Sequence, residues 1–77
     1  MGLPKESLVY NMDTTQKKVA KHLARALIEL DLADWDARDW KQMNKYIRTV
    51  RASVSNLFTS TGYEFAENPL RVRIRKA

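Results

Sequence analysis

Residues 40–60 read WKQMNKYIRTVRASVSNLFTS and carry the clearest periodicity in the chain. The spacing between their apolar positions alternates between three and four residues, which is the period of an amphipathic α-helix. These positions are Trp40, Met43, Ile47, Val50, Val54 and Leu57, with Phe58 beside them. We therefore expect this segment to be helical, with Trp40 at the start of its apolar stripe and in the core.

The length of the segment raises the question of its continuity. The pattern extends back to about residue 36, and an unbroken helix over residues 36–60 would be about 36 Å long at 1.5 Å per residue. A globule of 77 residues is only about 30 Å across. Because Asn44 competes with helical backbone hydrogen bonds, we expect two helices, at about residues 36–43 and 46–60. The alternative is one helix that a partner subunit covers.

The segments before this stretch also contain helix signals. Residues 13–16, Asp-Thr-Thr-Gln, have the spacing of a capping box, so a first helix is expected over about residues 14–31. Residues 1–12 are expected to form an arm, or a short strand that joins the C-terminal hairpin through the strand formers at residues 7–11. The aspartates of residues 31–39 are expected to form a turn and to cap the next helix.

The C-terminal segment favours a β-hairpin over about residues 63–75. Gly62 suits the left-handed end of a helix, and residues 67–69, Glu-Asn-Pro, supply turn chemistry. After that turn, apolar residues alternate strictly with arginines, which is the period of a strand. The predicted fold class is therefore mainly α with a C-terminal β-hairpin (α+β), in a single domain that spans residues 13–77.

Composition excludes several classes of protein. The chain has 77 residues, a formal charge of +5 and no cysteine, which removes disulfides, thiolate metal sites and a cysteine nucleophile. No apolar run is long enough to span a bilayer, so we expect no membrane association and a cytoplasmic location. The chain has no phosphate-binding glycine loop and no zinc motif, and its one histidine, His22, reads as a surface residue. We therefore expect no enzyme, no cofactor and no metal.

Charge is distributed unevenly, and this defines the candidate site. No acid occurs between Trp40 and Tyr63, whereas a solvated helix usually mixes both signs. The polar side of the predicted helical segment holds Lys41, Asn44, Lys45, Arg48, Arg51 and Ser55. A basic face left for solubility would explain this pattern. The functional alternative is a helix that contacts phosphates and base edges, with Arg48 and Arg51 as the base readers.

The last strand adds a second basic element. Arg71, Arg73 and Arg75 share one of its faces, where they could follow a polyanion backbone. They could instead protect a sheet edge or pair with Glu64 across the hairpin.

The order of the predicted elements resembles that of a winged helix-turn-helix domain: a helix, a short helix, a longer basic helix and a hairpin. In such domains the third helix enters the major groove and the wing contacts phosphate or the minor groove. The resemblance implies these roles for residues 46–60 and for residues 71–76, with Lys18 and Lys21 expected to add phosphate contacts. The later turn has no glycine, which departs from the helix-turn-helix pattern.

Three functions follow as hypotheses. The first is a small protein that binds double-stranded DNA, as a transcriptional or replication regulator of the size that phages and mobile elements carry. The second is a protein-interaction module or inhibitor that forms a homodimer or docks on an acidic protein, because the apolar positions of residues 40–57 could form a two-chain seam. The third is RNA binding, which an arginine-rich strand also fits.

Overall fold

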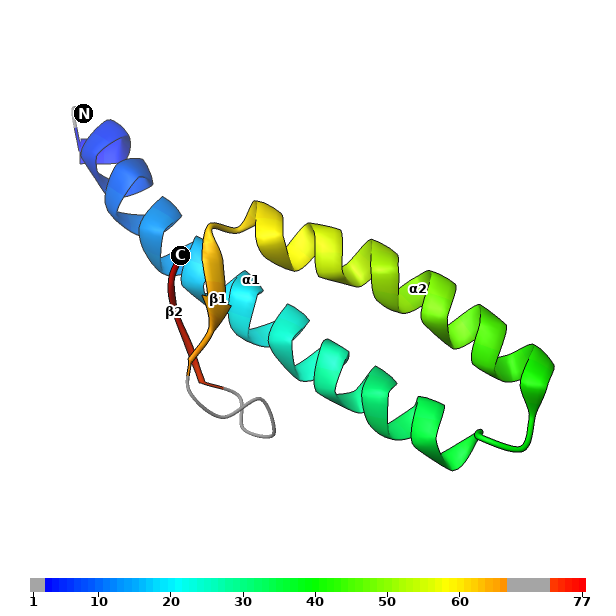
Figure 1. The fold of residues 1–77 in the computed structure, drawn as a ribbon. Coiled ribbons are helices and arrows are strands. Elements are labelled where there is room, and N and C mark those ends of the chain that lie inside the picture. The colour runs from blue at the N-terminus through cyan, green and yellow to red at the C-terminus, as the bar shows by residue number, and fades with distance from the viewer. Residues whose placement is uncertain (1–2, 67–72) are drawn as a thin grey trace.

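The structure is a computed structural model that describes residues 3–66 and 73–77, with side chains described from residue 13 onward. Two long helices run antiparallel side by side, and a small β-hairpin follows them (Figure 1). The elements are α1 (Leu3–Asp36), α2 (Lys41–Ser60), β1 (Tyr63–Phe65) and β2 (Ile74–Lys76). The fold is thus α+β with a C-terminal antiparallel two-stranded hairpin, as the sequence predicts at this level.

The first helix begins ten residues before the predicted capping box, at Leu3. The arm or short strand expected at residues 1–12 is therefore wrong for residues 3–12, because these residues are helical, and Asp13 lies inside the helix. Pro4 falls in the first turn, where its missing N–H would have no partner in any helix. No glycine or proline lies between Pro4 and the end of the helix at Asp36, so neither residue type interrupts it.

Residues 41–60 form one continuous helix, so the predicted break between helices at 36–43 and 46–60 is wrong. The side chain of Asn44 does not compete with its own backbone, since its Nδ2 donates to the backbone oxygen of Asp34 at 3.0 Å and to Oδ1 of Asp34 at 2.7 Å. The molecule is also no globule: its radius of gyration is 15.7 Å and its extents are 58 × 24 × 15 Å. A 20-residue helix fits within this length.

The turn between the helices differs from the predicted one in the roles of its aspartates and of Trp40. Asp34 and Asp36 end α1 instead of capping a new helix, and hydrogen bonds such as Trp40 N to Ala37 O, 2.9 Å, close the turn. Trp40 occupies the N-cap position of α2 and is 60% exposed, so its expected place in the core is wrong. Trp35 is exposed as well, and the Arg38 guanidinium lies 4.8 Å from the centre of its ring.

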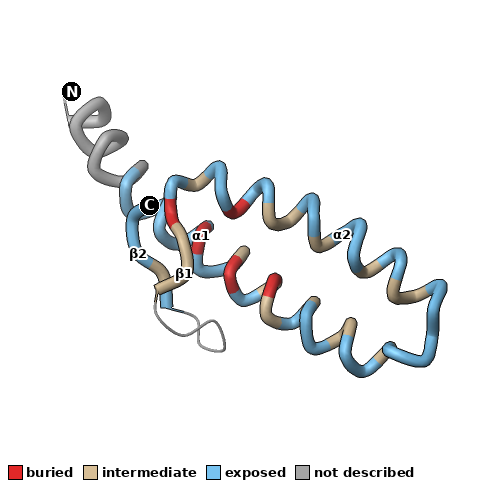
Figure 2. Tube along the Cα trace, viewed as in Figure 1, coloured by how far each residue is buried: buried red, intermediate tan, exposed pale blue. Residues whose placement is uncertain are grey.

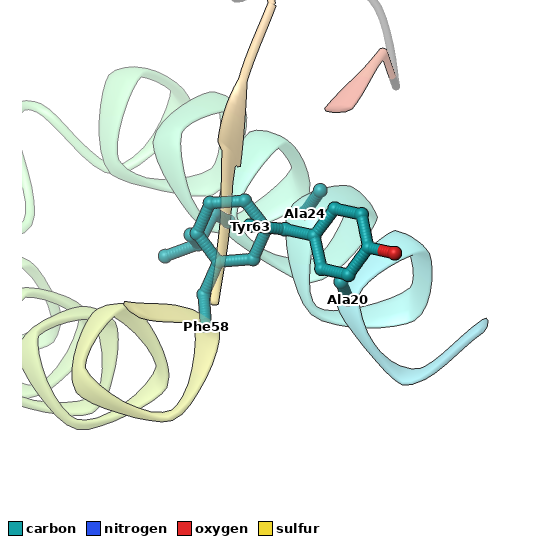
Figure 3. Close-up of a cluster of buried hydrophobic side chains, with 5 residues drawn as sticks. Ala20, Ala24, Phe58 and Tyr63 are labelled. Atoms are coloured by element: carbon teal, nitrogen blue, oxygen red, sulfur yellow. The ribbon is translucent and has the colours of Figure 1, made fainter. Parts of the chain in front are cut away.

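The hydrophobic core is small and lies at the β-hairpin end of the molecule (Figure 2). It consists of Ala20, Ala24, Leu27, Phe58 and Tyr63. Tyr63 and Phe58 meet over the two alanines of α1 (Figure 3), whose small side chains let the rings lie close to the helix. The rings of Phe58 and Phe65 are 5.0 Å apart and tilted by 43°. Packing at this end attaches the β-hairpin to both helices.

Gly62 makes the exit from α2 to the hairpin, with φ of 80°, as its predicted role requires. The antiparallel register pairs Tyr63 with Lys76 and Phe65 with Ile74. The amide of Ala77 then donates to the Gly62 carbonyl at 2.9 Å and closes the hairpin against the helix exit. The predicted turn at residues 67–69 and the positions Leu70, Arg71 and Val72 lie outside the described residues.

Candidate nucleic-acid interface

The antiparallel helices α1 and α2 form a helical hairpin. Acids of α1 form ion pairs with bases of α2 across it. Nε and Nη2 of Arg51 on α2 donate to Oδ1 and Oδ2 of Asp31 on α1, the second at 3.3 Å. Nε of Arg48 lies 3.6 Å from Oδ1 of Asp34. The hydrogen bonds that Arg51 donates to Asp31 raise the pKa of the Arg51 guanidinium, which stays charged. Arg51 thus joins α2 to α1 in this structure instead of pointing away from the molecule.

The residues predicted to lie on one polar side of α2 therefore divide into two groups. Asn44 and Arg51 point toward α1, and Ser55 is half-buried. Lys41 and Lys45 are exposed and border an open pocket with Gln42. Arg48 remains 74% exposed despite its ion pair. The structure does not bring all six residues onto one free face.

The charges of the turn half of the molecule, residues 29–51, cancel. This half contains five bases and five acids. Because α2 runs antiparallel to α1, the acids at the end of α1 lie opposite the bases at the start of α2. The sequence contains a signal for this cancellation, because an acidic segment and a basic segment of equal and opposite charge lie on either side of the turn. The basic segment alone suggested a polyanion site, and the neighbouring acids neutralise it.

The described residues of the other half, 13–28, 52–66 and 73–77, contain seven bases and two acids. Their net charge of +5 equals that of the whole chain. We call these seven bases the basic end. They are Lys17, Lys18, Lys21, Arg25, Arg73, Arg75 and Lys76, all of them exposed.

Two ion pairs tie part of the basic end to the fold. Nε of Arg75 lies 2.7 Å from Oε2 of Glu64 across the hairpin, which is the pairing that the sequence offered as an alternative to polyanion binding. Nζ of Lys76 lies 3.6 Å from Oδ1 of Asp13 on α1 and fixes β2 to the helix. The side chains of Glu64 and Asp13 are 46% and 64% exposed, so these pairs are weak and solvent-screened. Both cations can therefore still contact a polyanion.

Of the predicted contact residues, Lys18, Lys21, Arg73 and Arg75 belong to the basic end, and Arg71 lies outside the described residues. Lys41, Lys45 and Arg48 lie toward the opposite end of the helical hairpin (Figure 1). The sequence reasoning missed Lys17 and Arg25. Their spacing from Lys18 and Lys21 places all four bases along one broad side of α1, a signal that was present in the sequence.

The described residues hold no group of three side chains that could bind a metal ion. Within the same residues, neither helix has a window apolar enough to cross a bilayer. No protein-family model, curated protein or solved structure matches the chain at a significant level.

Proposed function

We propose that this protein binds nucleic acid, with duplex DNA as its principal ligand, through the basic end. One observation carries the proposal: the net charge of +5 lies on one end of an elongated molecule, while the other end is neutral. Lysines and arginines that neutralise phosphates release condensed counterions, and this release drives binding. A charge concentrated in this way also orients the protein as it approaches a polyanion.

The basic end supplies contacts from two elements. Lys17, Lys21 and Arg25 follow one another along α1 at intervals of four residues, about 6 Å of helix axis. Arg73 and Arg75 are about 6.8 Å apart along the hairpin, because alternate strand residues share a face. Both spacings suit contacts with successive phosphates. Guanidinium groups at such positions can bind phosphate oxygens through two hydrogen bonds.

The winged helix-turn-helix form of this proposal needs three helices, whereas the described residues form two. We therefore propose only the two contact roles of such domains: a helix that lies against the duplex, and a basic hairpin that contacts phosphate as a wing. In our proposal the helix is α1, since residues 29–51, which include the N-terminal bases of α2, contain as many acids as bases. Lys41, Lys45 and Arg48 then contribute little.

A titration with duplex DNA at several salt concentrations tests the proposal. About six phosphate contacts predict that log K falls with log salt at a slope near −5. The double variant Lys18→Gln/Lys21→Gln should weaken binding and reduce this slope by about 2. The matched variant Lys41→Gln/Lys45→Gln removes the same charge from exposed helical lysines at the neutral end, and its slope should stay near that of the wild type.

A wild-type slope near zero would refute nucleic-acid binding, and equal losses in the two variants would refute the assignment to the basic end. Structured RNA and single-stranded DNA form further arms of the same titration. Tighter binding to either would replace duplex DNA as the ligand.

An acidic protein partner is the second candidate, because carboxylates and phosphates attract the same bases. Polyglutamate at equal charge serves as the competitor in the titration. If it displaces duplex DNA at equal concentration, the basic end recognises negative charge alone, which favours the acidic protein.

A further inference from the structure

One side of the helical hairpin carries no lysine, arginine, aspartate or glutamate. At about 100° per residue, six positions of α1 and five of α2 point to this side of the two-helix layer. Those of α1 are Thr15, Val19, Leu23, Ala26, Leu30 and Ala33. Those of α2 are Met43, Tyr46, Val50, Ser53 and Leu57. In a chain of which 30% is charged, this uncharged face requires an explanation.

The uncharged face is open to water. Val19 is 43% exposed, and Tyr46, Val50 and Leu57 are between 50% and 57% exposed. Val19, Leu23 and Leu57 line a groove between the two helices, with Thr15, Ser60 and Thr61 at its polar margin. The same groove shows that residues of both helices meet on this side. A contiguous apolar patch with a polar margin marks an interaction surface.

The two strands of the β-hairpin leave this face uncovered. Tyr63 packs on Ala20 and Ala24 of α1, which are fully buried, whereas Val19 and Leu23 still border the open groove. The smallest extent of the molecule is 15 Å, close to the thickness of a single layer of helices. Helices in stable domains bury their apolar side against a second layer. Among the described residues, 3–66 and 73–77, no such second layer covers the uncharged face.

We propose that a second copy of this chain covers the uncharged face and forms a homodimer of two stacked helical hairpins. Each copy carries a net charge of +5, and the absence of charge from the face lets two such copies meet without burying like charges. A partner recognised by its acidity would need bases on this face, and the bases lie elsewhere. A face that is uncharged throughout also suits the self-complementary contact of a twofold dimer.

The area of the face is sufficient for a dimer. A helix of 20 residues is about 30 Å long, and two adjacent helices are about 20 Å wide. Each copy would therefore bury about 600 Å², or about 1,200 Å² in total, which is at the lower limit for a specific interface. We expect a dissociation constant in the micromolar range.

Sedimentation equilibrium of the full chain, from low micromolar to near-millimolar concentration, tests the proposal. The mass should approach twice the 9.0 kDa of one chain. The double variant Val50→Lys/Leu57→Lys should shift the mass to that of the monomer. It should keep its helix content by circular dichroism, because both side chains are at least half exposed in one copy.

Leu32→Lys is the matched control. Leu32 is 51% exposed, like Val50, but it points to the charged side of α1, so this variant should still dimerise. A wild-type mass of 9.0 kDa at every concentration would overturn the proposal, and so would equal disruption by Leu32→Lys. These variants keep the basic end, so the result is independent of nucleic-acid binding.

Discussion

Arg51 on α2 holds both carboxylate oxygens of Asp31 on α1, twenty residues earlier in the chain. This pair connects the middle of α2 to the C-terminal part of α1, away from the buried residues of the core. Within the described residues, it is one of two ion pairs between the acidic segment before the turn and the bases after it, the other being Arg48 with Asp34. The helical hairpin is therefore held by charge at its turn half and by apolar packing at its other end.

The Arg51–Asp31 pair should contribute only modestly to stability, because the two side chains are 41% and 56% exposed. A double-mutant cycle with Arg51→Ala and Asp31→Ala should give a coupling energy of about 0.5–1 kcal/mol in urea unfolding at low salt. The coupling should decrease as salt is added. A coupling well above this range would mean that the pair is more shielded from water than its exposure indicates.

Asn44→Ala should destabilise the protein by about 1–2 kcal/mol in chemical unfolding. Asn44 donates to the backbone oxygen of Asp34, one of the last carbonyls of α1, and so completes the end of that helix. The neighbouring variant Gln42→Ala is the control, because the amide of Gln42 reaches only the exposed hydroxyl of Tyr46. Equal losses in both variants would contradict a helix-capping role for Asn44.

Phe58→Ala should cost about 3–5 kcal/mol and leave much of the protein unfolded at 25 °C, since a chain of this size has only a few kcal/mol of stability. Phe58 is 5% exposed and contacts Phe65, so its removal opens the centre of the core. Thermal unfolding followed by circular dichroism at fixed protein concentration measures the effect. Leu32→Ala, at a half-exposed position, should change the midpoint by little.

Gly62→Ala should destabilise the protein by about 1–2 kcal/mol, because an alanine with φ of 80° is strained. A Cβ at this position would meet no atom within 4 Å, so the cost comes from the backbone alone. Gly62→Asn should recover part of the loss, since asparagine tolerates the left-handed conformation better. If Gly62→Asn were as unstable as Gly62→Ala, backbone strain would not be the cause.

Local patterns predicted the helical period of residues 40–60, the Gly62 exit and the position of the β-hairpin. The errors involve residues whose partners lie far away in the chain. Asn44 was expected to break a helix because nothing in its neighbourhood reveals the Asp34 carbonyl that it binds. Trp40 was assigned to the core because it starts the apolar stripe, but it lies at the turn, in the N-cap position before α2, where it is 60% exposed.

The candidate site shows the same limit. A count of bases along α2 indicated a basic surface, but the acids that neutralise it lie on the preceding helix and become neighbours only when the chain folds. The basic end combines bases from α1 and from the hairpin, some fifty residues apart. Local spacing in the sequence therefore suggested Lys18, Lys21, Arg73 and Arg75 as contact residues without showing that they belong to one end of the molecule.

Trp35 and Trp40 are exposed to solvent at or next to the turn between the helices, at the opposite end of the helical hairpin from the core and the basic end. Their fluorescence should therefore change little when the protein unfolds, and it reports instead on what reaches the turn. Nucleic acid bound at the other end of the 58 Å molecule should leave the emission unchanged, whereas a ligand held by Lys41 and Lys45 should quench it. The intrinsic tryptophan fluorescence of the chain thus indicates which of its two ends a ligand occupies.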